Sequence, residues 1–109
     1  MLSEVETVSR RIAYKILTAT QWQTLDTTGR FEGAPVDLAD GYIHMSAADQ
    51  VAGTAAKHFA GQRDLVIATV DLAALGGAVV WEPSRGGQLF PHLYGALPRT
   101  AITGTAPLL

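Results

Sequence analysis

The stretch Gly41-Tyr42-Ile43-His44-Met45-Ser46 has the pattern of a short strand that runs directly into a helix. Successive side chains of a strand point to opposite faces, so Tyr42, His44 and Ser46 share one face and Ile43 and Met45 share the other. The apolar pair can face a core, and the polar three can face a cleft where the helix begins. The pattern therefore predicts a strand at 41–45 and a candidate site, without naming a reaction.

Size and composition predict one globular domain. The chain has 109 residues, of which 48% are hydrophobic, and it contains no cysteine. These values exclude a disulfide framework and a thiol nucleophile, and they argue against disorder. The net charge is −2 without a run of like charges, so strong non-specific binding to nucleic acid or membrane is not indicated.

The N-terminal segment, residues 1–10, is polar and is expected to be a flexible lead-in to a domain at 11–109. It lacks the apolar core of a signal peptide, and no apolar run in the chain approaches the roughly 20 residues of a membrane span. A cytoplasmic protein is the expectation.

The first half of the chain predicts a strand and two helices. Residues 11–17 alternate and indicate the first strand. Thr18-Ala19-Thr20-Gln21 has the form of a capping box, and the short helix that follows is expected to end before Gly29. Residues 29–40 are predicted to be an irregular loop. Ser46-Ala47-Ala48-Asp49 is a second capping signature, for a helix to about residue 60 with a buried stripe at Val51, Ala55 and Phe59.

The second half predicts mostly strands. Residues 64–70 are an apolar, β-branched run typical of a central strand, and residues 78–82 indicate another. A flexible loop is expected at 83–88. Pro91 assigns residues 89–95 to an edge strand or irregular segment, and 99–103 is the last expected strand. Strands that outnumber early-clustered helices favour an α+β class.

Two histidines are candidates for one site. His44 and His92 both fall at expected strand ends beside loops, and if residues 90–94 are extended, His92 and Tyr94 share a face. A cleft lined by His44, His92, Tyr94 and Ser46 would be rich in donors and acceptors, and imidazoles can transfer protons near neutral pH. The alternative is that each histidine is structural. His58 is expected to be solvated.

Charged residues near these segments allow two interpretations each. Glu82 is either a catalytic carboxylate or a solvated acid at the end of a strand whose other face carries Trp81. Arg85, beside Gly86-Gly87, either binds an anion or is a mobile surface residue. Asp37 and Asp40 are explained by turn chemistry.

Three alternative chemistries have weak support. His44, His92 and Glu82 would make a two-histidine, one-carboxylate metal set, but no tight local spacing supports it and no metal is predicted. His44-Met45-Ser46 fits one H-x-S motif of phosphoesterases that use two, whereas His92-Leu93-Tyr94 is a poor second copy. Gly86-Gly87 does not form a phosphate-binding loop.

Several strings together resemble a known family. These are Tyr14-Lys15-Ile16-Leu17, Gly41-Tyr42-Ile43-His44-Met45-Ser46, Gln50 with Thr54-Ala55, Trp81-Glu82 and Phe90-Pro91-His92-Leu93-Tyr94-Gly95. They resemble domain-of-unknown-function family 952, over about residues 12–102. The family has no established activity.

That family in turn is similar to the ADP-ribosyltransferase superfamily, in its RNA 2′-phosphotransferase branch. Ile43-His44-Met45-Ser46 matches a strand with a V-H-L-S-like string, and Val70-Asp71 matches an apolar strand that ends in V-D. Tyr14-Lys15-Ile16 stands where that branch has H-G-T. The resemblance implies a single α+β domain with a curved, split, mixed or antiparallel sheet and two main helices.

The resemblance also implies a function. It indicates a domain that binds, and in its enzymatic form turns over, an NAD-like, ADP-ribose-like or nucleotide ligand, as an ADP-ribosyl- or 2′-phosphotransferase would. His44, His92 and Glu82 are then the catalytic candidates. The ligand-binding candidates are Tyr14, Lys15, Tyr42, Ser46, Arg85 and Tyr94. NAD is the candidate cofactor, and the alternative is a non-catalytic ligand-sensing or partner-binding module on the same fold.

Overall fold

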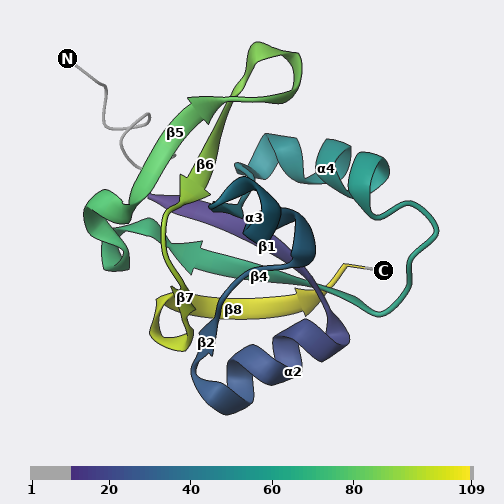
Figure 1. Cartoon of the computed structure of the whole chain (residues 1–109). Coiled ribbons are helices and arrows are strands. Elements are labelled where there is room, and N and C mark those ends of the chain that lie inside the picture. Colours follow the sequence, from purple (N-terminus) through teal and green to yellow (C-terminus); the bar gives the residue numbers. More distant parts are fainter. Residues whose placement is uncertain (1–10, 109) are drawn as a thin grey trace.

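The computed structural model describes residues 11–108, whose strands form three antiparallel sheets. The first sheet has the order β1-β4-β8, with β1 at Ile12–Thr18, β4 at Leu65–Asp71 and β8 at Ile102–Pro107. Figure 1 shows these strands side by side across the middle of the molecule. The predicted central strand is confirmed as β4, which pairs with both neighbours.

The last strand lies later in the chain than the sequence indicates. Residues 99–101 form a 3₁₀ turn, and β8 starts at Ile102. Its pairing with β4 shifts register between Thr69 and Val70, which is a β-bulge.

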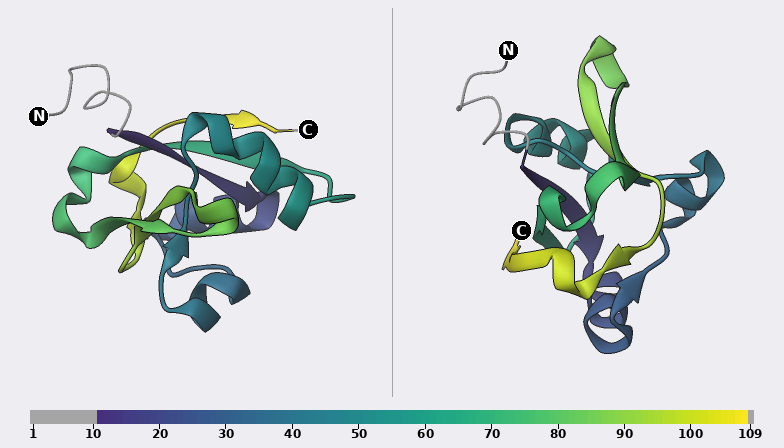
Figure 2. Two further views of the ribbon diagram at one scale, coloured as in Figure 1. Left: turned by 90° about the horizontal axis from the view of Figure 1, so that it is seen from above. Right: turned by 90° about the vertical axis from the view of Figure 1, so that its left-hand side faces the viewer.

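The second three-stranded sheet carries the candidate histidines. Its order is β3-β6-β5, with β3 at Ile43–His44, β6 at Leu89–Leu93 and β5 at Val79–Pro83. Strands β5 and β6 form a hairpin that extends away from the body of the molecule (Figures 1 and 2). The predicted strand at 41–45 is reduced to two residues, followed by a bridge between Ser46 and Tyr14 of β1.

The assignment of residues 89–95 to an edge or irregular segment is wrong, because β6 is the middle strand of its sheet. Pro91 is tolerated for a geometric reason. Its carbonyl oxygen accepts a bond from the Met45 amide at 3.1 Å. The backbone N and O of one strand residue point to the same neighbouring strand. The N–H that Pro91 lacks would therefore point toward Met45, just past the end of β3, and not into the β5–β6 ladder.

The two longest helices of the described residues are α2 (Ala19–Thr28) and α4 (Val51–His58). The capping box of α2 is confirmed: the Thr18 hydroxyl accepts from the Gln21 amide at 3.1 Å, and the Gln21 side chain accepts from the Thr18 amide at 2.9 Å. Gly29 ends this helix in the left-handed conformation, with φ 89°.

The predicted cap at Ser46 is wrong by one residue. The Gln50 side chain accepts from the Ala47 amide, and a 3₁₀ turn at Ala48–Gln50 leads into α4. The Ser46 hydroxyl bonds Thr54 instead. Although all of α4 is described, none of its residues is fully buried, so the expected stripe is only half-buried.

The prediction of an irregular loop at 29–40 is also wrong. Strand β2 (Arg30–Phe31) pairs with β7 (Leu97–Pro98), and Pro35–Asp40 forms the short helix α3. Pro35 suits the first helical turn because its missing N–H is not needed there. The Asp37 side chain accepts from the Ala34 amide at 2.8 Å, which caps the same turn.

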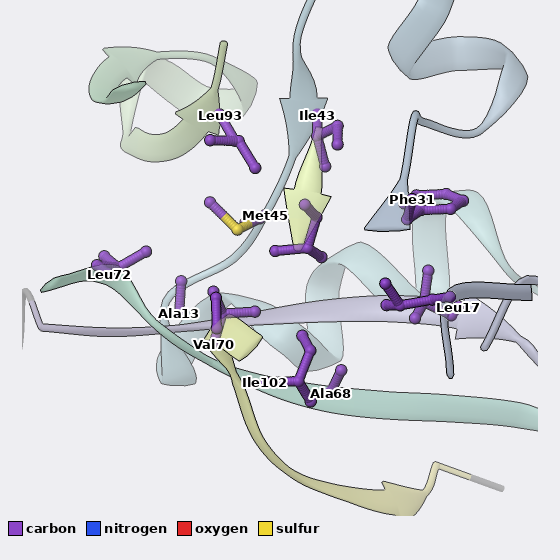
Figure 3. Packing of buried hydrophobic residues seen from close by; sticks show 13 residues of the cluster. Ala13, Leu17, Phe31, Ile43, Met45, Ala68, Val70, Leu72, Leu93 and Ile102 are labelled. Atoms are coloured by element: carbon purple, nitrogen blue, oxygen red, sulfur yellow. The ribbon is translucent and has the colours of Figure 1, made fainter. Parts of the chain in front are cut away.

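The core joins the three sheets and α2. Buried side chains from β1, β3, β4 and β6 meet in one cluster, in which Met45 lies between Leu93 and Ala13 (Figure 3). Ile43 and Met45 are buried, as the alternation of their strand predicts, with exposures of 1% and 3%. The structure is therefore α+β with antiparallel sheets. The predicted flexible lead-in, residues 1–10, lies outside the described residues.

Candidate functional site

A cavity of 580 Å³ lies between the two larger sheets and α4. One wall comes from β1, where Tyr14, Lys15 and Ile16 line it. A second comes from His44 of β3, His92 of β6 and Tyr42, which directly precedes β3. The third comes from α4 and the segment after it, together with Ser84 and Arg85 of the hairpin. The volume is within the range of small-molecule sites.

Asp37 organises the histidine side of this cavity. It is buried, with 2% exposure, and receives the Lys15 ammonium at 3.2 Å and the His44 ring and amide at 2.6 Å and 3.0 Å. Burial alone would raise the pKa of Asp37, but the charge of Lys15 and the hydrogen bonds from His44 and Ala34 outweigh it and hold that pKa below 3.8. The site thus contains a buried, ionised pair.

Lys15 is the other member of this pair. Its ammonium also donates to the His44 carbonyl oxygen at 2.9 Å. Burial lowers the pKa of Lys15 below 10.5, and the attraction of Asp37 offsets part of that effect. Lys15 therefore fixes the backbone of β3 as well as the carboxylate beside it.

The His44 ring lies between two carboxylates. Its Nδ1 is 2.6 Å from Asp37, and its Nε2 is 2.9 Å from the exposed Asp40. A carboxylate only accepts hydrogen bonds, so both contacts form only when both ring nitrogens carry protons. With a single proton, kept at Nδ1 by the buried Asp37, Nε2 becomes an acceptor for another group in the cavity.

His92 is held by one carboxylate. Its ring is buried, and Nδ1 lies 2.8 Å from Glu82, which also accepts from the Tyr94 hydroxyl at 2.7 Å. The hydrogen bonds from Tyr94 and His92 lower the pKa of Glu82. The bond between Tyr94 and Glu82 also raises the pKa of Tyr94. Among residues 11–108 no group bonds His92 Nε2. Every buried side-chain nitrogen and oxygen in this part of the chain has a hydrogen-bond partner, so Nε2, which has none, is not a fully buried atom. Nε2 is therefore open to the cavity that His92 lines.

Tyr42 joins the two histidines. Its ring stacks on His92 with centroids 4.0 Å apart and lies 4.7 Å from the His44 ring. The two histidine rings are 5.5 Å apart, because His44 and His92 are register partners in the β3–β6 ladder. Burial and the charges of Asp40 and Glu82 raise the pKa of Tyr42, so its hydroxyl stays protonated at neutral pH.

The opposite wall carries basic side chains. Lys57 and His58 of α4 and Arg85 of the hairpin line it. The Arg85 guanidinium contacts the Thr54 hydroxyl at 3.4 Å and lies over the Phe90 ring at 5.1 Å. Thr54 in turn is 3.0 Å from the Ser46 hydroxyl, which connects this wall to the end of the histidine strand.

A family model described as protein of unknown function, DUF952, matches residues 16–105 of the chain. The chain belongs to the DUF952 family. The resemblance inferred from the Gly41–Ser46 and Phe90–Gly95 strings is thereby confirmed for this family, whereas a relationship to the ADP-ribosyltransferases is not shown.

This DUF952 chain is similar to three solved structures of protein CC0527. The crystal structure of protein CC0527 from Caulobacter crescentus has 49% identity and a TM-score of 0.85, over 88% of this chain and 84% of that chain. A crystal structure of its double mutant has 47% identity and a TM-score of 0.84 over the same shares. The solution NMR structure has 49% identity and a TM-score of 0.79, over 90% and 84%. Comparison with curated proteins gave no match.

The predicted site residues of this DUF952 domain are divided by the structure into two groups. The residues of the first group line the cavity: His44, His92, Tyr42, Tyr14, Lys15, Ser46 and Arg85. The second group, Glu82 and Tyr94, does not line it. The Glu82 carboxylate bonds both the His92 ring and the Tyr94 hydroxyl. Their catalytic and binding roles stay predictions. The Arg85 guanidinium has two partners, the Thr54 hydroxyl and the Phe90 ring, and both interpretations of Arg85, as an anion-binding or a mobile surface residue, stay predictions.

Sequence reasoning missed several residues of the site. Asp37 and Asp40 are not turn residues alone, since both bond the His44 ring. His58 is exposed but lines the cavity. No local spacing rule signals these contacts, because α3 ends at Asp40 and the chain reverses at Gly41 before His44 in β3.

Two further properties concern the described residues alone. Within residues 11–108, no group of three histidine, aspartate or glutamate side chains is placed to hold a metal ion. In the same part of the chain, no helix is long and apolar enough to cross a membrane.

Proposed function

We propose that the cavity binds a nucleotide or ADP-ribose-like ligand and that the domain is a transferase acting on it. One observation carries the proposal: two histidines, each with Nδ1 on a carboxylate, meet in one ladder and line one cavity. Imidazoles can transfer protons near neutral pH, and the contact of Nδ1 with a carboxylate orients each ring.

The roles of the residues follow from their partners. When His92 is neutral and its one proton lies on Nδ1, Nδ1 donates a hydrogen bond to Glu82. Nε2 then has a lone pair, which can accept a proton from a ligand hydroxyl or water. Tyr94 is a positioning residue, because it acts on His92 through Glu82. His44 Nε2 presents either a donor or an acceptor to a ribose or phosphate, and the stacked Tyr42 ring offers an apolar face to the ligand.

We further propose a remote relationship to the ADP-ribosyltransferase superfamily, with NAD as the candidate cofactor. Supporting it are the histidine strand β3 and the apolar strand β4 that ends in Val70-Asp71. The first strand departs from the pattern, since Lys15 stands in the place of a cofactor-binding motif and is committed to Asp37.

The first experiment is a thermal-shift and calorimetric titration with NAD, ADP-ribose, AMP and an RNA end bearing a 2′-phosphate. A ligand at a hundredfold excess over Kd stabilises the native state by about 2.7 kcal/mol, which raises the melting temperature by roughly 10 °C. We expect this shift to be lost in His44→Ala, with Arg63→Ala, an exposed residue that does not line the cavity, as the control. A folded His44→Ala variant that binds as wild type would refute the assignment.

The second candidate function is a non-catalytic sensing or partner-binding module. The commitment of Lys15 to Asp37 at the first motif favours it. The two functions are distinguished by incubating the protein with NAD or ADP-ribose for hours and measuring by chromatography whether the ligand is converted. Turnover that is lost in His92→Gln, with binding retained, identifies the enzyme, whereas an unchanged ligand identifies the module.

A further inference from the structure

Basic side chains gather on one wall of the cavity, away from the carboxylates. Lys57 and His58 project from the last turn of α4, and Arg85 comes from the tip of the β5–β6 hairpin. Among the described residues that line the cavity, Asp40 is the one carboxylate, and it is bonded to His44. The basic wall, defined as Lys57, His58 and Arg85, therefore has no acid facing it within the cavity.

The position of Arg85 is built by the fold. The turn Arg85–Gly87 contains Gly86 at φ 66°, a left-handed conformation that suits glycine and folds the tip over. The guanidinium then rests over Phe90 and reaches Thr54 of α4. A Cβ on Gly53 would lie 3.0 Å from Arg85 Nη2, so the absence of a side chain at Gly53 lets the guanidinium approach the helix.

Arg85 has donors to spare. A guanidinium carries five N–H groups, and among the described residues Arg85 makes one hydrogen bond, at 3.4 Å. The planar fork matches two oxygens of a phosphoryl group. Lys57 also complements the C-terminal end of α4, but that role does not explain a second cation, Arg85, that arrives from a different element.

The electrostatics agree with this geometry. The pKa of His58 is lowered, chiefly by partial burial. The positive charges of nearby residues lower it further, namely those of Lys57, Arg85, His44 and Lys15. His58 therefore lies in a positive field to which both walls of the cavity contribute. An anion between the walls would relieve that repulsion.

We propose that Thr54, Lys57, His58 and Arg85 form a phosphate subsite, which binds the phosphomonoester or diphosphate of the ligand. The proposal rests on the proposed function for the rest of that ligand. The tyrosine and histidine wall then receives the nucleoside or ribose part, while Arg85 and Lys57 bind the phosphoryl oxygens. The same chemistry would accept a free nucleotide, a phosphorylated RNA end or inorganic pyrophosphate.

The test is calorimetry at constant ionic strength with adenosine, AMP, ADP-ribose, pyrophosphate and a 2′-phosphorylated RNA end. We expect AMP to bind at least about tenfold more tightly than adenosine, as one or two charge-assisted hydrogen bonds provide. Arg85→Ala and Lys57→Ala should each weaken AMP by about tenfold and leave adenosine unchanged. Arg63→Ala, which removes an exposed charge outside the cavity, should change neither.

The outcomes separate this proposal from the proposed function. Pyrophosphate binding that Arg85→Ala abolishes, without any nucleoside preference, supports the subsite and refutes the nucleotide ligand. Adenosine binding with no gain from its phosphate, or AMP binding unchanged in both variants, overturns the subsite. Binding of none of the phosphorylated probes also overturns it. Tighter binding of AMP than of the RNA end identifies a free nucleotide as the source, and the reverse order identifies RNA.

Discussion

Replacing Asp37 with alanine should unfold the domain at a much lower temperature. Asp37 is buried with Lys15, and the variant would leave the Lys15 ammonium buried with the His44 carbonyl oxygen as its remaining partner. Breaking a buried pair by removing one partner costs about 3–5 kcal/mol. With about 2.1 cal/mol/K of unfolding entropy for each of 109 residues, this corresponds to about 13–22 °C in melting temperature.

The assay is calorimetry together with urea unfolding followed by circular dichroism. Asp40→Ala is the matched control, since it removes the exposed carboxylate from the same ring and should cost under about 1 kcal/mol. Adding Lys15→Met to Asp37→Ala removes the unpaired cation and should recover part of the loss. A loss below about 1 kcal/mol in Asp37→Ala, or strict additivity in the double variant, would refute the reasoning.

Three further predictions concern the hairpin, the second histidine and acid. Gly53→Ala should raise the melting temperature, since alanine gains up to about 1 kcal/mol in an exposed helix, yet weaken AMP binding by displacing Arg85; unchanged AMP affinity would contradict this. Tyr94→Phe should raise the pKa of Glu82, measured by NMR titration, because its first hydrogen-bond donor is lost; an unmoved titration would contradict it. Because the pKa of Asp37 is lowered in the folded state, Asp37 stabilises the fold at pH values above its unfolded pKa near 3.8, and this stabilisation should be lost as the pH falls below that value. Asp37→Asn should remove this part of the acid dependence. Equal dependence of stability on pH in the wild type and the variant would contradict the assignment.

Elements whose signals are local could be predicted from the sequence. Thr18 and Gln21 are three residues apart and form the expected capping box, and Gly29 ends the helix as expected. Residues 64–70 indicated a central strand because they are apolar and rich in β-branched residues, and β4 is the middle strand of its sheet, although part of it is only half-buried. The α+β class followed from these elements.

The errors came from interactions between distant segments. Pro91 lies in a middle strand because β3 ends beside it, which no property of residues 89–95 encodes. Residues 29–40 were expected to be irregular, yet α3 is capped by Asp37, whose other partner Lys15 is 22 residues away. His44 and His92 were predicted to meet, and the register places them opposite one another.

The short elements of the site depend on the same residue that fixes its chemistry. Strand β3 has two residues and helix α3 has six, lengths at which intrinsic propensity does not maintain a conformation. Asp37 supplies what propensity does not: it caps α3 through the Ala34 amide, bonds the His44 amide in β3 and orients the His44 ring. A variant at Asp37 would therefore alter both stability and binding. His44→Ala and Arg85→Ala remove side chains that are not fully buried, so a loss of ligand in them at unchanged melting temperature can be assigned to the cavity.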